Sequence, residues 1–99
     1  METRILISNL WYTQRHIDKQ KVIDLIRLDG LFDSPILLRK AFDDEIEIIN
    51  GHHRITALWQ SKHEYLTLGE FVLVYSESRC ARFGRIKDSV AISRKGYIG

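Results

Sequence analysis

Residues 50–54, with the sequence NGHHR, constrain the fold of this chain more than any other segment. An apolar run, IEII at residues 46–49, precedes them, and a helix-forming run, ITALW at residues 55–59, follows. This pattern predicts a strand that turns directly into a helix, because Gly51 tolerates the positive φ that a tight turn can require. The turn therefore fixes how one strand and one helix are joined.

The same turn is a candidate phosphate site. The first N–H groups of a helix lack intrahelical acceptors and carry a partial positive charge, which attracts anions. Arg54 adds a planar fork of donors that suits phosphate oxygens, and Gly51 lets a ligand approach the backbone closely. An alternative stays open, in which Arg54 pairs with an Asp or Glu of the hairpin and contributes little to stability.

Length and composition predict one small domain. The 99 residues are 44% hydrophobic and 28% charged, as in ordinary globular proteins. The single cysteine, Cys80, cannot form an internal disulfide, and no apolar run approaches the roughly 18 residues of a membrane span. The first eight residues contain too short an apolar run for a signal peptide. We therefore expect a cytoplasmic protein that does not associate with membranes.

Charge is distributed unevenly along the chain. Residues 1–75 contain 9 Lys and Arg against 11 Asp and Glu, whereas residues 76–99 contain 6 against 2. A basic C-terminal segment can meet an acidic partner, either nucleic acid or protein. The alternative is a solvated surface segment without a partner.

Apolar periodicity and turn signals predict an α+β fold with the order strand, helix, β-hairpin, helix, strand. Asp18 is a good N-cap for the first helix, and Gly30 is placed to end it. Ser34 and Pro35 then block helix and start extended structure. The expected strands are residues 4–8, 36–39, 46–49 and 71–75, and the second helix is expected at residues 52–62.

Two stretches, DGLFDSPILLR at residues 29–39 and IEIINGHHRITAL at residues 46–58, resemble the superfamily of ParB N-terminal domains and sulfiredoxins. The family pattern is a helix that ends in glycine, a Pro-Ile-apolar strand, a hairpin, and Gly-x-x-Arg at the start of the next helix. The resemblance is carried by residues 4–75. It implies a ParB/sulfiredoxin-like core at residues 1–75, with residues 76–99 as a basic extension of the same domain.

Members of this superfamily bind nucleotides, with the phosphates on the Gly-x-x-Arg helix start. The resemblance thus implies that this chain binds ATP, ADP or CTP, together with Mg²⁺. The loop from Gly30 to Pro35 would form the neighbouring wall, where the hydroxyl of Ser34 either contacts phosphate or stabilises the turn. The residues so implicated in phosphate or nucleotide binding are Gly30, Ser34, Gly51, His52, His53 and Arg54.

Departures from the family pattern leave the activity open. Sulfiredoxins have a reactive cysteine where this chain has His52, so sulfinic acid reduction is not expected. Partition proteins of the ParB type have Glu-Arg in place of His52 and His53. They also carry a helix-turn-helix domain, for which no residues remain, so specific centromere binding is not expected. Free serine kinases have a catalytic acid near the start of the first helix, where this chain has residues 14–16 (QRH) and Asp18 close by.

The candidates for proton transfer, if the protein is an enzyme, are His53, Asp18 and His16. His53 can act near neutral pH or simply bond to a carbonyl group, and Asp18 can act only as an N-cap. His52 is interpreted either as an exposed helix-start residue or as a phosphate contact. No protein metal site is expected, because the histidines lack ligand-like spacing. The acidic turn at residues 43–45 either is solvated or binds Mg²⁺ with a nucleotide.

Three functions are compatible with the sequence. The first is nucleotide or phosphate binding at residues 51–54, with or without phosphoryl transfer or hydrolysis. The second is a DNA- or RNA-binding regulatory protein that uses Arg54 and the basic segment. The third is a phage or mobile-element accessory protein that binds and modulates a host or partner protein.

Overall fold

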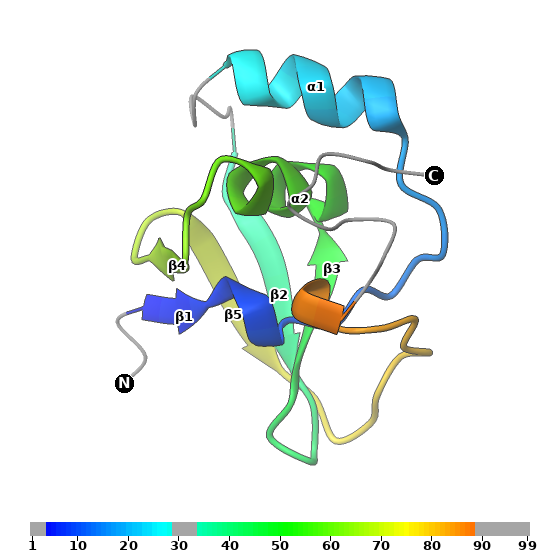
Figure 1. Ribbon diagram of the computed structural model, residues 1–99. Coiled ribbons are helices and arrows are strands. Elements are labelled where there is room, and N and C mark those ends of the chain that lie inside the picture. Colours follow the sequence, from blue (N-terminus) through cyan, green and yellow to red (C-terminus); the bar gives the residue numbers. More distant parts are fainter. Residues whose placement is uncertain (1–3, 29–33, 89–99) are drawn as a thin grey trace.

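The computed structural model describes residues 4–28 and 34–88, and it forms an α+β fold of two helices and five short strands (Figure 1). The expected fold class is confirmed. The elements in chain order are β1 (Arg4–Leu6), α1 (Lys19–Arg27), β2 (Ile36–Lys40), β3 (Ile46–Asn50), α2 (His52–Gln60), β4 (Tyr65–Thr67) and β5 (Phe71–Tyr75), with short 3₁₀ turns η1 (Ile7–Asn9) and η2 (Ile86–Asp88).

A three-stranded sheet with the order β3-β2-β5 forms one side of the molecule. β2 and β3 make an antiparallel hairpin, whereas β5 returns parallel to β2 after a crossover through α2. The register of β2 against β3 shifts between Leu37 and Leu38, which marks a bulge near the end of the hairpin that leads into α2. The start of β2 and the end of β3 therefore lie side by side at the end of the sheet where α2 begins.

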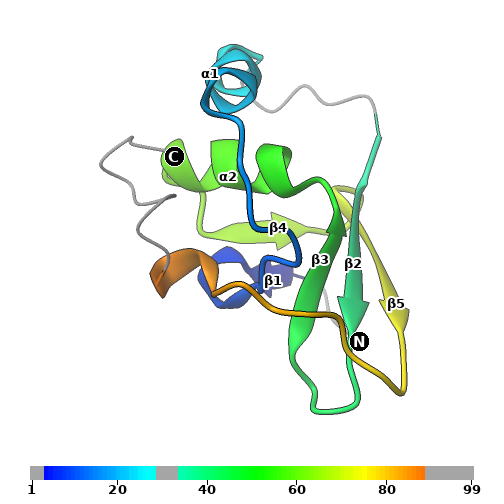
Figure 2. The ribbon, with the colours of Figure 1, turned by 90° about the vertical axis from the view of Figure 1, so that its right-hand side faces the viewer.

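One face of this sheet is covered by α2 and the β1–β4 pair, whereas α1 packs on α2. Figure 2 shows α2 beside the sheet, with α1 above α2 and the antiparallel β1–β4 pair below α2. The buried core lies between these layers, since apolar side chains of each layer face the others. Its fully buried members include Ile7, Leu10, Ile36, Leu38, Ile48, Ile55, Leu66 and Ile86.

Residues 10–12 and 83–86 extend the sheet beyond β3. Trp11 forms a parallel bridge to Glu47 of β3 and an antiparallel bridge to Arg85, so residues 10–12 lie beside β3 and residues 83–86 lie beside residues 10–12. Ile86 is fully buried in η2. The end of the described C-terminal segment is therefore packed against the domain, whereas residues 89–99 of the basic extension lie outside the described residues.

Most expected elements are present, with shifted ends. Asp18 caps α1 by accepting hydrogen bonds from the N–H groups of Gln20 and Lys21, as its N-cap role predicts. α2 ends at Gln60 rather than at Lys62, and β4 was not expected at all. Gly30, the expected end of α1, lies outside the described residues. No helix within residues 4–28 and 34–88 is long and apolar enough to cross a membrane.

Candidate functional site

Gly51 joins β3 to α2 in the left-handed conformation, with φ 106° and ψ 23°. A Cβ atom at this position would lie 3.1 Å from Ile36 Cγ1 and 3.2 Å from Arg54 Nη2. Glycine is thus required by its backbone conformation and by the close approach of two neighbouring side chains. No side chain caps this helix start, so the first N–H groups of α2 are left for solvent or a ligand.

Arg54 is held beside this helix start by the residue that precedes Pro35. Its Nη1 donates to the carbonyl oxygen of Ser34 at 2.7 Å and to the Ser34 hydroxyl at 3.1 Å. The alternative in which Arg54 pairs with an acid of the hairpin is wrong, because the ion pairs of the hairpin acids within the described residues are all with other arginines. The Ser34 hydroxyl accepts from Arg54, and its own proton stays available to a ligand.

A cavity of about 290 Å³ opens at this helix start. Its lining combines backbone, amide, imidazole and guanidinium groups from four parts of the chain, with one apolar side chain from α1. The lining residues are Gln14, Leu25, Asn50, Gly51, His52, His53 and Arg54. Such a small, polar and cationic hollow has room for a phosphate-sized group.

His53 connects this helix start to the first helix. Its Nε2 accepts a hydrogen bond of 2.9 Å from the backbone N–H of Asp18. A nitrogen that accepts carries no proton, so the proton of the neutral ring is on Nδ1. Burial lowers the pKa of His53, and nearby Lys21 lowers it further. His53 is therefore a neutral ring whose Nδ1–H is its donor.

His52 is buried, with 5% of its surface exposed, so the expectation of an exposed residue is wrong. Its Nε2 accepts from the backbone N–H of Thr13 at 3.2 Å, and its ring stacks on Tyr12 with centroids 5.9 Å apart. Burial lowers the pKa of His52 to about 4. The ring thus holds residues 12–13 against α2, and the backbone N–H of His52 remains a candidate phosphate donor.

The three candidates for proton transfer, Asp18, His53 and His16, differ in whether their side chains already make hydrogen bonds within the protein. The carboxylate of Asp18 caps α1, and hydrogen bonds from the N–H groups of Lys21 and Gln20 lower its pKa. Nε2 of His53 is occupied by the N–H of Asp18. His16 is exposed. The structure therefore brings Asp18 and His53 together, but through a backbone N–H rather than through the carboxylate.

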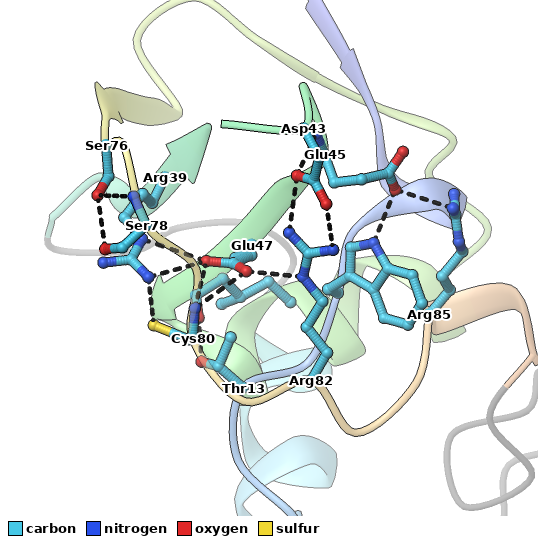
Figure 3. Close-up of polar contacts among 12 residues, drawn as sticks. Thr13, Arg39, Asp43, Glu45, Glu47, Ser76, Ser78, Cys80, Arg82 and Arg85 are labelled. Atoms are coloured by element: carbon cyan, nitrogen blue, oxygen red, sulfur yellow. Dashed lines mark hydrogen bonds and ion pairs between the residues drawn. The ribbon is translucent and has the colours of Figure 1, made fainter. Parts of the chain in front are cut away.

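The acidic turn is engaged by the C-terminal segment (Figure 3). Arg82 donates to both oxygens of Asp43 at 2.8 and 2.9 Å, and Arg85 pairs with Glu45 at 2.8 Å. The hydrogen bonds from Arg82 lower the pKa of Asp43 to about 2. These two carboxylates are thus not simply solvated. Two of the basic residues expected to meet an external partner instead neutralise acids of this chain.

Glu47 is the centre of this network, and sequence reasoning did not single it out. It is fully buried, and it accepts from Arg39 at 3.1 Å, from Arg82 at 2.7 Å and from the backbone N–H of Cys80. Burial would raise the pKa of Glu47, but these donors outweigh burial and lower it. The only sequence signal is a charged residue inside an apolar strand, which requires a partner when buried.

Within the described residues, no group of three or more His, Cys, Asp or Glu side chains is arranged to hold a metal ion.

Comparison with known proteins bears on the fold. No protein-family model matches this sequence, and no curated protein matches it. Among solved structures, the chain is similar to protein Atu1540 from Agrobacterium tumefaciens, with a TM-score of 0.58 and 21% sequence identity. The similarity covers 75% of this chain and 40% of that protein. At this identity the likeness concerns the arrangement of the backbone alone.

Proposed function

We propose that this protein binds a nucleotide through its phosphates at the start of α2. The observation that carries the proposal is the uncapped helix start at Gly51, with Arg54 anchored beside it by Ser34. The anchor uses Nη1 only, so the remaining donors of the guanidinium can bind phosphate oxygens. Partial positive charge from the helix and the full charge of Arg54 would act on the same anion.

The neighbouring groups support the same ligand. The Nδ1–H of His53 and the hydroxyl proton of Ser34 are donors without an acceptor among the described residues. Gln14 and Asn50 supply amide groups at the cavity wall. The resemblance of residues 29–39 and 46–58 to ParB and sulfiredoxin domains favours ATP, ADP or CTP with Mg²⁺ as the ligand.

The proposal is binding rather than catalysis. Phosphoryl transfer needs a group that accepts a proton from the attacking hydroxyl or water. Nε2 of His53 accepts from the N–H of Asp18, so this nitrogen is not free as a base in this arrangement. Oδ1 of Asp18 caps α1, and these hydrogen bonds lower the pKa of the carboxyl group, which makes it a poor base. An enzymatic reaction would require His16 or a group from the acceptor substrate to act instead.

Calorimetric titration with ATP, ADP, CTP and GTP in the presence of Mg²⁺ tests the proposal. We expect saturable binding of one nucleotide and a loss of at least tenfold in affinity for Arg54→Lys, because an ammonium cannot reproduce the planar fork. Arg27→Lys is the matched control, since Arg27 is exposed at the end of α1. Absence of binding at millimolar nucleotide would exclude the proposal.

Nucleic acid binding is the competing hypothesis, and the structure offers it less support. Arg82 and Arg85 are paired with carboxylates of the acidic turn, which reduces the positive charge available to a phosphate backbone. The two hypotheses differ in salt dependence, because nucleic acid binding that releases many counterions weakens steeply between 50 and 200 mM salt, on the order of 10³-fold or more.

A further inference from the structure

The hairpin end of the three-stranded sheet carries an exposed hollow that the proposed function does not use. β2 and β3 pair Lys40 with Ile46 at this end and Leu37 with Asn50 at the other, where α2 begins. The hollow has a volume of about 360 Å³ and is lined by residues 40–42, Asp44 and residues 75–77. Figure 1 shows the β2–β3 hairpin extending past the β1 layer at this end.

Two aromatic side chains dominate this hollow. Tyr75 is 72% exposed and Phe42 is 66% exposed, the two largest values among the exposed large hydrophobic residues of residues 4–28 and 34–88. Both side chains line the same hollow. Single exposed apolar residues are common on protein surfaces, but a pair of aromatics in one concavity is typical of a binding site, where tyrosine is often an energetic hot spot.

The charges around the aromatics favour a cationic partner. Asp44 and Glu77 line the hollow, and neither has an ion pair with another described residue. The other acids of the hairpin, Asp43, Glu45 and Glu47, are all paired with arginine. Lys40 also lines the hollow, and it is not without a partner in the protein.

We infer that this hollow docks an arginine-bearing segment of a protein partner. A guanidinium group is planar, so it stacks on an aromatic face while it pairs with a carboxylate. The hollow supplies both features, with Phe42 and Tyr75 as faces and Asp44 and Glu77 as counter-charges. The same stacking already occurs inside this protein, where Arg85 lies over the ring of Trp11 at 4.7 Å while its guanidinium bonds to Glu45.

NMR titration of the full chain with the capped peptide acetyl-Gly-Arg-Leu-Arg-Gly-amide tests this inference. We expect saturable shifts confined to residues 40–44 and 75–77, and no such shifts with the matched peptide that has citrulline in place of arginine. Citrulline keeps the shape and removes the charge. Shifts spread over the whole surface, equal shifts with both peptides, or no saturable shift at millimolar peptide would each overturn the inference.

Variants of the hollow test the contribution of its carboxylates and that of its aromatic rings separately. The double variant Asp44→Asn/Glu77→Gln and the single variant Tyr75→Ala should each weaken the peptide about fivefold or more, and added salt should weaken binding to the unaltered protein. Val72→Ala is the control, because Val72 is exposed on the same strand but lies outside the hollow. Unchanged affinity in both test variants would overturn the inference. Nucleotide binding at the opposite end of the sheet does not enter this test.

Discussion

The imidazole of His53 accepts a hydrogen bond from the backbone N–H of Asp18, 35 residues earlier in the chain, at 2.9 Å. The bond joins the start of α2 to the start of α1. Asp18 in turn caps α1 with its carboxylate, so one residue contacts both helices. The starts of the two helices are therefore connected through Asp18. A ligand that moved the start of α2 would also move the start of α1.

His53→Ala should loosen the start of α1. The N–H of Asp18 would lose its acceptor, at a cost of about 1 kcal/mol in the free energy of unfolding. Amide hydrogen exchange should show faster exchange of the Asp18 N–H and of the first turn of α1. His63→Ala is the control, because His63 is exposed and follows the other end of α2, and it should leave these rates unchanged. Equal exchange in both variants would contradict the role assigned to His53.

Gly51→Ala should destabilise the protein more than Gly69→Ala. Both glycines have positive φ, 106° and 97°, so both substitutions carry the backbone cost of about 1–2 kcal/mol. At Gly51 the new Cβ would also press on Ile36 and Arg54 within 3.2 Å, whereas at Gly69 nothing lies within 4 Å. Urea unfolding should therefore separate the variants by about 1 kcal/mol or more. Equal losses of stability would show that the site relaxes without strain.

Stability should fall as the pH drops from 7.5 to 5. Burial lowers the pKa of His52 to about 4 in the folded protein, against 6.5 for an ordinary histidine side chain. Between these two pKa values the imidazole is protonated in the unfolded chain and neutral in the folded chain. Protonation of the unfolded chain lowers the free energy of unfolding by about 2 kcal/mol at pH 5. The contribution is complete above pH 6.5 and is lost as the pH falls toward 4.

His52→Gln tests this pH dependence. The amide oxygen of glutamine can accept from Thr13 and does not titrate, so urea unfolding of the variant should depend less on pH between 7.5 and 5. His63→Gln should behave as the original chain does, because His63 is exposed. Both measurements lie above the range in which the carboxylates with lowered pKa, Asp43 and Glu47, become protonated. An identical pH profile for His52→Gln and the original chain would contradict the assignment.

Glu47→Gln should cost about 3 kcal/mol in the free energy of unfolding, because it removes a fully buried charge and leaves Arg39 and Arg82 short of a counter-ion. Hydrogen exchange should also quicken at Cys80, whose N–H bonds to Glu47. Asp24→Asn is the control. Asp24 meets Arg27 only at 4.0 Å on an exposed surface, so its loss should change stability by less than about 0.5 kcal/mol. A small effect at Glu47 would mean that Arg82 remains adequately paired by Asp43.

Local chemistry explains which elements the sequence predicted. The N-cap at Asp18, the positive φ at Gly51 and the extended run after Pro35 each depend on a few adjacent residues. Such features are visible in any stretch of sequence, because capping and backbone preference act within one turn. The sequence did not predict β4, because this strand has three residues of which only Leu66 is buried, and so short a segment shows no alternation of apolar and polar residues.

The candidate site was predictable only in part. The placement of Gly51 and Arg54 at a helix start followed from the sequence. The anchoring of Arg54 by Ser34 and the acceptor role of His53 involve partners 20 and 35 residues away. Periodicity carries no information about which distant group a polar side chain will meet, so the alternative partner for Arg54 was wrong and the burial of His52 was missed.

By itself the sequence determined an α+β fold with a glycine turn between a strand and a helix, because these features depend on local backbone preference and on the apolar pattern. Tertiary structure alone decided that Glu47 is buried beneath Arg39 and Arg82, and that the basic segment neutralises the acidic turn. The reason is physical: a buried charge is tolerated only where long-range packing brings its counter-charges within hydrogen-bonding distance.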